Sequence, residues 1–88
     1  MDDQDLLSEL LELAQSLGIG VRTAEACSDG GGTLVRLKGQ EVLFLDPSAD
    51  LADRIDAAAA ALAGRPELED RFLVPEVRSA IERATPKP

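Results

Sequence analysis

The chain has 88 residues and a formal net charge of −8; it contains two phenylalanines and one cysteine, and no histidine, tryptophan or tyrosine. A hydrophobic content of 44% is typical of a folded chain, and the length predicts one domain over residues 1–88, with 85–88 as a frayed tail. The lack of histidine excludes an imidazole base, a Ser-His or Cys-His nucleophile pair and a histidine metal ligand.

Leucines at helical spacing predict a first helix from about Asp3 to Leu17. Its apolar stripe is wide enough to lie on a sheet. Asp2 or Asp3 is expected to cap the amino end, and Gly18 to end the helix in a left-handed conformation.

Three strands are predicted next. Residues 19–26 alternate weakly and predict the first strand, followed by a turn or flexible loop over 27–32. Residues 33–37 and 40–45 predict a β-hairpin around the two-residue turn Lys38-Gly39. The last strand is apolar on both faces from Val42 to Leu45, so one face is expected to meet the helices and the other to be covered by something else or exposed.

Asp46-Pro47 predicts the start of a second helix, with a carboxylate cap and proline at the first position. Its buried stripe is expected to consist of Leu51, Ile55, Ala58 and Leu62, and Gly64 to end it. Residues 67–72 predict one helical turn, and Val74-Pro75 begins a last helix that runs to Ala84.

The predicted fold class is therefore α+β, in the order α-β-β-β-α-α. We expect a three-stranded antiparallel β-meander packed by helices, with the first two helices on one face of the sheet. The core must be aliphatic, because Phe44 and Phe72 are the only aromatic residues.

The polar clusters all have a structural explanation. The only cation near Cys27 in the sequence is Arg22, which favours a structural or incidental thiol over a reactive one. Gly30–Gly32 leads into a strand rather than a helix, which favours a connection over a phosphate loop. Asp46, Asp50 and Asp53 suit a helix start better than a metal site. The acids and arginines of residues 65–71 are more typical of a solvent-exposed face with weak ion pairs than of an acid–base pair with an anion clamp. We accordingly predict no catalytic, cofactor-binding or metal-binding residues and no enzymatic activity.

The order of elements over about residues 3–64 resembles the double-stranded RNA-binding fold. That family grips phosphates with a basic cluster at the start of its last helix. Here the corresponding stretch is Asp46-Pro47-Ser48-Ala49-Asp50, which is acidic. Nucleic-acid binding is therefore kept only as an alternative.

Four stretches together resemble a group of small bacterial proteins with the α-β-β-β-α layout. They are Leu34–Gly39, Val42–Asp46, Leu68–Leu73 and Pro75–Arg78. No activity comes with the resemblance, so it assigns no site.

The charge and the amino-terminal residues predict the cellular compartment and the kind of partner. Met1-Asp2-Asp3 is acidic where a secretory signal is basic, and no apolar run reaches the roughly 18 residues that span a membrane. One cysteine cannot form an internal disulfide. We expect a cytoplasmic protein, and a negative field that repels nucleic acid and membranes but attracts a basic protein.

The leading hypothesis is a non-catalytic protein-interaction or regulatory module, in which a homodimer is one expected form. The alternatives are nucleic-acid binding and the binding of a small ligand. The residues predicted to contact a partner are Arg36 and Lys38 on the hairpin, and Arg71 and Phe72 near the last helix. For Phe72 the competing expectation is a place in the core.

Overall fold

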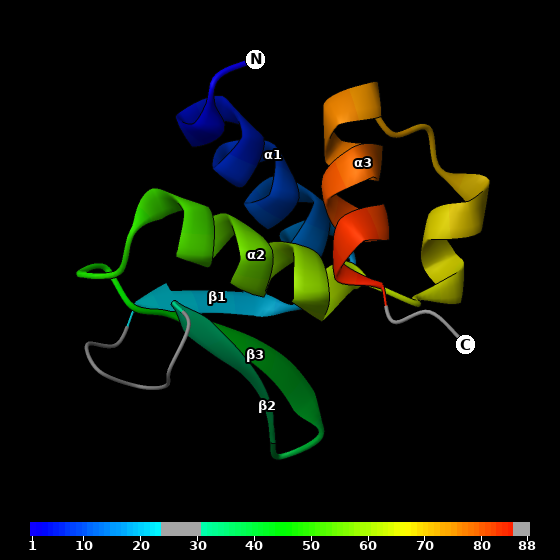
Figure 1. The fold of residues 1–88 in the computed structure, drawn as a ribbon. Coiled ribbons are helices and arrows are strands. Elements are labelled where there is room, and N and C mark those ends of the chain that lie inside the picture. Colours follow the sequence, from blue (N-terminus) through cyan, green and yellow to red (C-terminus); the bar gives the residue numbers. More distant parts are fainter. Residues whose placement is uncertain (24–30, 86–88) are drawn as a thin grey trace.

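A three-stranded sheet carries all of the helices on one face in the computed structural model of the chain (Figure 1). The structure describes residues 1–23 and 31–85. The predicted α+β class and the order α-β-β-β-α-α are confirmed. The elements are α1 (Asp3–Ser16), β1 (Gly20–Thr23), β2 (Gly32–Leu37), β3 (Gln40–Leu45), α2 (Leu51–Leu62), the 3₁₀ helix η1 (Pro66–Asp70) and α3 (Pro75–Ala84).

The first helix begins and ends where the sequence predicts. Asp2 is the amino-terminal cap, since its Oδ1 accepts a hydrogen bond of 2.8 Å from the backbone N–H of Asp5. The helix buries a leucine face that includes Leu6 and Leu10. Gly18 follows the helix with a φ of 86°, the left-handed conformation expected of it.

The predicted antiparallel meander is wrong, because β3 and not β2 is the central strand. The sheet order is β1-β3-β2; β1 pairs with β3 in parallel, and only β2 and β3 are antiparallel. The chain therefore passes from β1 to the far edge before the hairpin returns β3 to the middle. A central strand has neighbours on both sides, and Val42 of β3 is only 6% exposed although it lies on the face without helices.

The register assigns the side chains of the sheet to two faces. Leu43 and Leu45 of β3 join the core beneath the helices, together with Leu34 of β2 and Val21 of β1. Val42 lies on the opposite face and is 6% exposed. The core is aliphatic, as predicted, and its largest fully buried side chains are Leu10, Ile19, Leu43 and Leu62.

The predicted start of the second helix at Asp46-Pro47 is also wrong. The Asp46 carboxylate accepts hydrogen bonds from the backbone N–H of Ser48 at 2.9 Å and from its hydroxyl at 2.7 Å. This local turn satisfies the carboxylate without a helix. Asp50 then has extended backbone angles, φ −59° and ψ 148°, so α2 begins only at Leu51.

The later helices begin and end near the glycine and proline residues that the sequence predicts. Gly64 has a φ of 76° just beyond α2, residues 66–70 form a 3₁₀ helix, and Pro75 is the first residue of α3. The predicted stripes along α2 and α3 are buried at Ile55 and Ile81 among others. Three parts of the prediction lie outside the described residues. They are the end of the first strand (24–26), most of the loop that follows, with Cys27, and residues 86–88. No helix in the described part of the chain is long and apolar enough to cross a membrane.

Two glycines allow α2 to rest directly on the beginning of β2. A Cβ added to Gly31 would lie 2.7 Å from the backbone carbonyl of Asp53. A Cβ on Gly32 would lie 2.6 Å from the Phe44 carbonyl oxygen and 3.1 Å from Ala57 Cβ. Gly31 also has a φ of 94°, which any other residue adopts only with strain. The glycines that the sequence presents as a connection are thus packing residues as well.

Gly31→Ala should therefore destabilise the protein more than Gly64→Ala. Both glycines have a positive φ, but a Cβ on Gly64 meets nothing within 4 Å. The left-handed strain is common to both variants, whereas only Gly31→Ala forces a side chain into the α2 backbone. We expect Gly31→Ala to cost about 1–3 kcal/mol more free energy of unfolding than Gly64→Ala. Urea unfolding measures this difference, provided that both variants have the same m value. Equal midpoints would show that the close approach of α2 to Gly31 does not limit stability.

The hairpin turn has the geometry of a type I′ turn. Lys38 and Gly39 have φ angles of 51° and 81°, and Lys38 is the one residue other than glycine with a positive φ in the described part of the chain. This turn matches the twist of the strands and prefers Asn-Gly, because asparagine tolerates the left-handed region better than lysine. Lys38 is thus fixed by the turn as well as exposed at its tip.

Lys38→Asn should stabilise the hairpin. The substitution keeps the turn type and lowers the conformational cost at position 38, by up to about 1 kcal/mol. Gln40→Asn, two residues away in a strand, serves as the control and should not stabilise. Thermal or urea unfolding checks the pair, and a destabilised Lys38→Asn would mean that the lysine side chain has a role the turn does not require.

Candidate interaction surface

The four residues predicted to contact a partner lie in two separate places. Arg36 and Lys38 are exposed on the β2–β3 hairpin, while Arg71 and Phe72 are exposed in the segment between η1 and α3. The hairpin turn and that segment lie at opposite ends of the molecule (Figure 1). The structure therefore brings Arg71 and Phe72 together but does not join them to Arg36 and Lys38.

Phe72 is on the surface and not in the core. It is 85% exposed, which makes it the most exposed large apolar side chain of the described residues. The segment after η1 is extended, with Arg71 at φ −111° and ψ 142°. Successive side chains of an extended segment point to opposite sides, so when Leu73 packs against the core its neighbour Phe72 is turned toward water. The competing expectation of a core residue is wrong.

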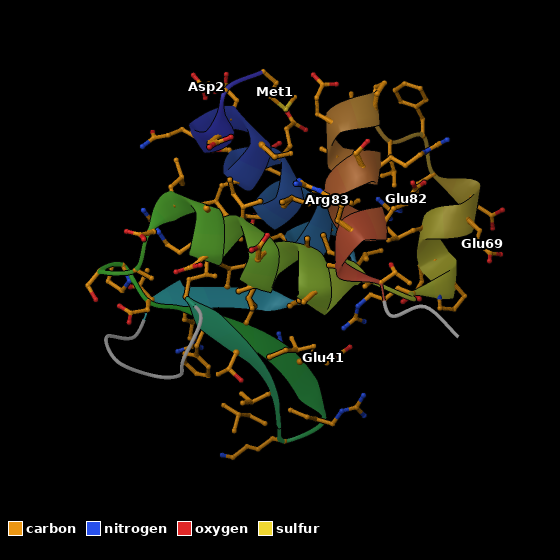
Figure 2. The ribbon with its side chains drawn as sticks, in the orientation of Figure 1. Met1, Asp2, Glu41, Glu69, Glu82 and Arg83 are labelled. Atoms are coloured by element: carbon orange, nitrogen blue, oxygen red, sulfur yellow. The ribbon has the colours of Figure 1, made fainter. Side chains whose placement is uncertain are left out.

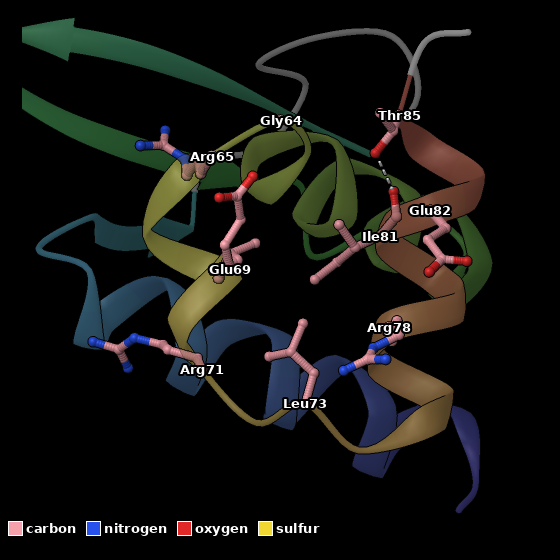
Figure 3. A pocket seen from close by; sticks show the side chains of 10 residues that line it. Gly64, Arg65, Glu69, Arg71, Leu73, Arg78, Ile81, Glu82 and Thr85 are labelled. Carbon is pink, nitrogen blue, oxygen red and sulfur yellow. Dashed lines mark hydrogen bonds between the residues drawn. The ribbon is translucent and has the colours of Figure 1, made fainter.

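Three hollows surround the segment from Arg71 to Val74, and together with it they form what we call the 71–74 surface. The first hollow, of 460 Å³, lies between η1 and α3 over Leu68, Leu73 and Ile81 (Figure 3). The second, of 340 Å³, lies between α1 and the residues that lead into α3. The third, of 260 Å³, is lined by Phe72, Leu73, Pro75, Arg78 and Ser79. Leu73 lines all three, and Phe72 stands between the second and the third.

The hollows differ in charge. Arg65, Arg71 and Arg78 line the first, facing Glu69 and Glu82. Figure 2 shows that Glu69 and Glu82 come from η1 and α3 respectively. The second hollow is apolar along Leu13, Leu73, Val74 and Val77, and its only charged lining residues are Glu9 and Glu12 of α1. One side of Phe72 thus faces an acidic and apolar groove.

Two hydrogen-bonded arginines hold the first hollow in place. Arg71 Nη1 donates to Ser16 Oγ at 2.9 Å, and that hydroxyl donates to the Leu13 carbonyl at 2.6 Å. Arg65 Nε donates to the Ala61 carbonyl at 2.7 Å, while its two Nη groups bind both carboxylate oxygens of Glu41. The Arg78 side chain, in contrast, makes no hydrogen bond or ion pair within residues 1–23 and 31–85, so its guanidinium is available to a ligand.

The Arg65–Glu41 pair ties the start of η1 to β3. The two residues are 24 positions apart, and their side chains are only 16% and 28% exposed. The hydrogen bonds from Arg65 lower the pKa of Glu41, and the same bonds raise the pKa of Arg65. Bidentate geometry makes this a strong form of ion pair. Sequence reasoning missed it, because nothing in the spacing links position 41 to position 65.

The predicted cluster of residues 65–71 is partly assembled. Arg65, Glu69 and Arg71 line the same hollow, whereas Glu67 and Asp70 are exposed and line none of the hollows described. Arg78 was missed as well; the signal available was its position on α3, out of step with the buried stripe of Val77, Ala80 and Ile81. Among the described residues there is no group of three or more His, Cys, Asp or Glu side chains that could hold a metal ion.

No protein-family model, curated protein or solved structure matches the chain.

Glu41→Gln should destabilise the protein near neutral pH and have little effect in acid. The lowered pKa of Glu41 means that its charged form favours the folded state. That contribution is fully present above the ordinary pKa of a glutamate and is lost as the pH falls through the lowered pKa. The gap in unfolding midpoint between wild type and Glu41→Gln should therefore shrink as the pH is lowered from 7 toward 3.

Glu69→Gln is the matched control for this experiment. Glu69 is exposed and makes no ion pair in the described part of the chain, so its substitution should shift the midpoint little at either pH. A gap for Glu41→Gln that stays constant with pH would show that the pair with Arg65 does not govern stability.

Proposed function

We propose that the protein is a non-catalytic interaction module whose 71–74 surface binds a protein segment. One observation carries the proposal: one of only two aromatic side chains in the chain, Phe72, is 85% exposed between two apolar hollows. Large aromatic side chains dominate binding energy at protein interfaces. Because Phe72 adjoins apolar hollows on two sides, a partner that covers it would bury a continuous apolar surface.

The charges around Phe72 indicate the chemistry of the segment. Glu9 and Glu12 flank the second hollow, and α1 also carries Asp3 and Asp5 with no basic residue. A bound segment would place apolar side chains in the second and third hollows and a lysine or arginine beside the two glutamates. Complementary charge of this kind adds specificity and speeds encounter.

Selection from a phage library of random short peptides tests this proposal. Apolar peptides enriched in Lys and Arg should be recovered, and their affinity should fall at least about tenfold for Phe72→Ser. Leu37→Ser is the control, because Leu37 is 52% exposed but lies on the hairpin at the other end of the molecule. Recovery of no peptide, or equal loss with both variants, would contradict the proposal.

A small ligand in the first hollow is a second candidate function. Its volume of 460 Å³ is within the range of about 300–1,000 Å³ typical of ligand sites. The apolar floor with arginines and glutamates at its rim suits a small molecule that carries a carboxylate. A thermal-shift screen of such compounds, repeated with Arg78→Ala, tests it. Nucleic-acid binding, suggested only by the order of elements, stays an alternative that retention on RNA at low salt would test.

A further inference from the structure

Strand β2 forms an edge of the sheet in the described part of the chain. Within residues 1–23 and 31–85 it pairs only with β3, and at six residues it is longer than β1, the opposite edge, at four. Its register with β3 is continuous from Gly32↔Leu45 to Leu37↔Gln40, so it contains no bulge, and it contains no proline. Proteins commonly block exposed edges with such features. Arg36 is the only charged residue in the strand.

The hairpin determines which backbone groups of β2 are unpaired. The two-residue turn makes Leu37 and Gln40 the closing pair, and antiparallel pairs alternate between those that exchange hydrogen bonds and those that do not. The N–H of Asp46 donates to the Gly31 carbonyl at 2.8 Å, which fixes the same alternation at the far end of the strands. The N–H and C=O groups of Gly32, Leu34 and Arg36 therefore point away from β3.

We propose that the β2 strands of two copies pair antiparallel and form a homodimer. In one register, Gly32 lies opposite Arg36 of the second copy and Leu34 lies opposite Leu34. This is the register that pairs all three outward-pointing residues of both strands. The product is a six-stranded sheet in the order β1-β3-β2-β2-β3-β1, with a two-fold axis at Leu34 and the helices of both copies on the same face.

The side chains at this seam complement each other. Arg36 lies on the helix-covered face, since the register places it with Leu34 and Glu41. Its opposite residue, Gly32, has no side chain to oppose the guanidinium across the seam, although α2 fills the space over Gly32 itself. Gly32 lies against Ala57 of α2, and Asp53 is one helical turn before Ala57 and exposed. The dimer thus brings Arg36 of one copy toward the end of α2 that carries Asp53 in the other.

The net charge of −8 per copy does not prevent this arrangement. The backbone of the acidic helix α1 comes close to β1 and not to β2 or β3 among the described residues. Its acids therefore lie over the outer edges of the six-stranded sheet, away from the seam. The described strands carry Arg22 and Arg36, and the hairpin turn carries Lys38, against the single strand acid Glu41, which is already bound to Arg65.

Arg36→Pro tests the pairing by sedimentation equilibrium or light scattering. Proline is tolerated on an edge strand where the N–H faces solvent, so the hairpin should persist while the outward donor is lost. Wild type should be a dimer at micromolar concentration and Arg36→Pro a monomer with an unchanged circular dichroism spectrum. Arg36→Thr, which keeps the donor but loses the charge, should dimerise with a dissociation constant raised several-fold.

A cross-linking measurement tests the register without proline. Thr33 lies opposite Val35 of the second copy in the proposed pairing, close enough for a disulfide. Oxidation of mixed Thr33→Cys and Val35→Cys chains, each also carrying Cys27→Ser, should give the mixed disulfide in preference to either symmetric product. Two cysteine thiols are oxidised to one disulfide, with the loss of two protons and two electrons to the added oxidant.

The results decide the proposal in each case. A monomeric wild type at the highest soluble concentration would overturn it, as would a dimer that survives Arg36→Pro in a folded chain. If Arg36→Pro does not fold, the mixed disulfide alone decides, and its absence overturns the proposal. A monomeric chain whose β2 edge binds a strand of a different protein would likewise contradict a second copy as the occupant.

Discussion

The close approach of α2 to β2 is the constraint on which the structure depends. An aliphatic core with no fully buried aromatic ring offers little bulk between the layers, so a helix and a sheet must come nearly into backbone contact. Small residues on both sides provide this: Gly31 and Gly32 on the sheet, and Ala57, Ala58 and Ala61 on α2. The gap that a Cβ would need is already occupied by the Asp53 backbone. Close packing here, rather than a few large side chains, holds the layers together.

This constraint also explains what sequence reasoning could and could not establish. The helices, the hairpin and most helix ends depend on neighbours within four or five residues, and these were predicted correctly at Asp2, Gly18, Gly64 and Pro75. Asp46 was predicted wrongly because two local structures compete for the same carboxylate, a helix cap and a turn closed by Ser48. Asp46 is also held by a distant residue, since its N–H donates to the Gly31 carbonyl at 2.8 Å, and no pattern within residues 46–50 shows that partner.

The strand order could not be derived from the alternation of apolar and polar residues, because that pattern indicates which face of a strand is buried and not which strands are its neighbours. One indication was present: Val42 to Leu45 is apolar on both faces, which is typical of a central strand. The same run also favours a covered second face, and Val42 on that face is only 6% exposed. The candidate interaction surface could likewise be predicted only in part. Arg71 and Phe72 could be selected from the sequence, whereas the pair of Arg65 with Glu41 and the hollows around Leu73 require the fold.

The two proposed surfaces belong to different layers, and this has a consequence for how they would work together. The 71–74 surface is built on α1, η1 and α3, and the backbone of α3 lies close to α1 and α2 rather than to a described strand. The β2 edge lies in the sheet. Pairing through β2 therefore leaves Phe72 uncovered in each copy, and a two-fold axis perpendicular to the sheet places both 71–74 surfaces on the helix side. Such a dimer would present two identical sites to the same partner, so that weak binding at each site is strengthened when a partner offers two segments with a matching separation. A module of 88 residues with a modest site could gain affinity in this way without a larger interface in either copy.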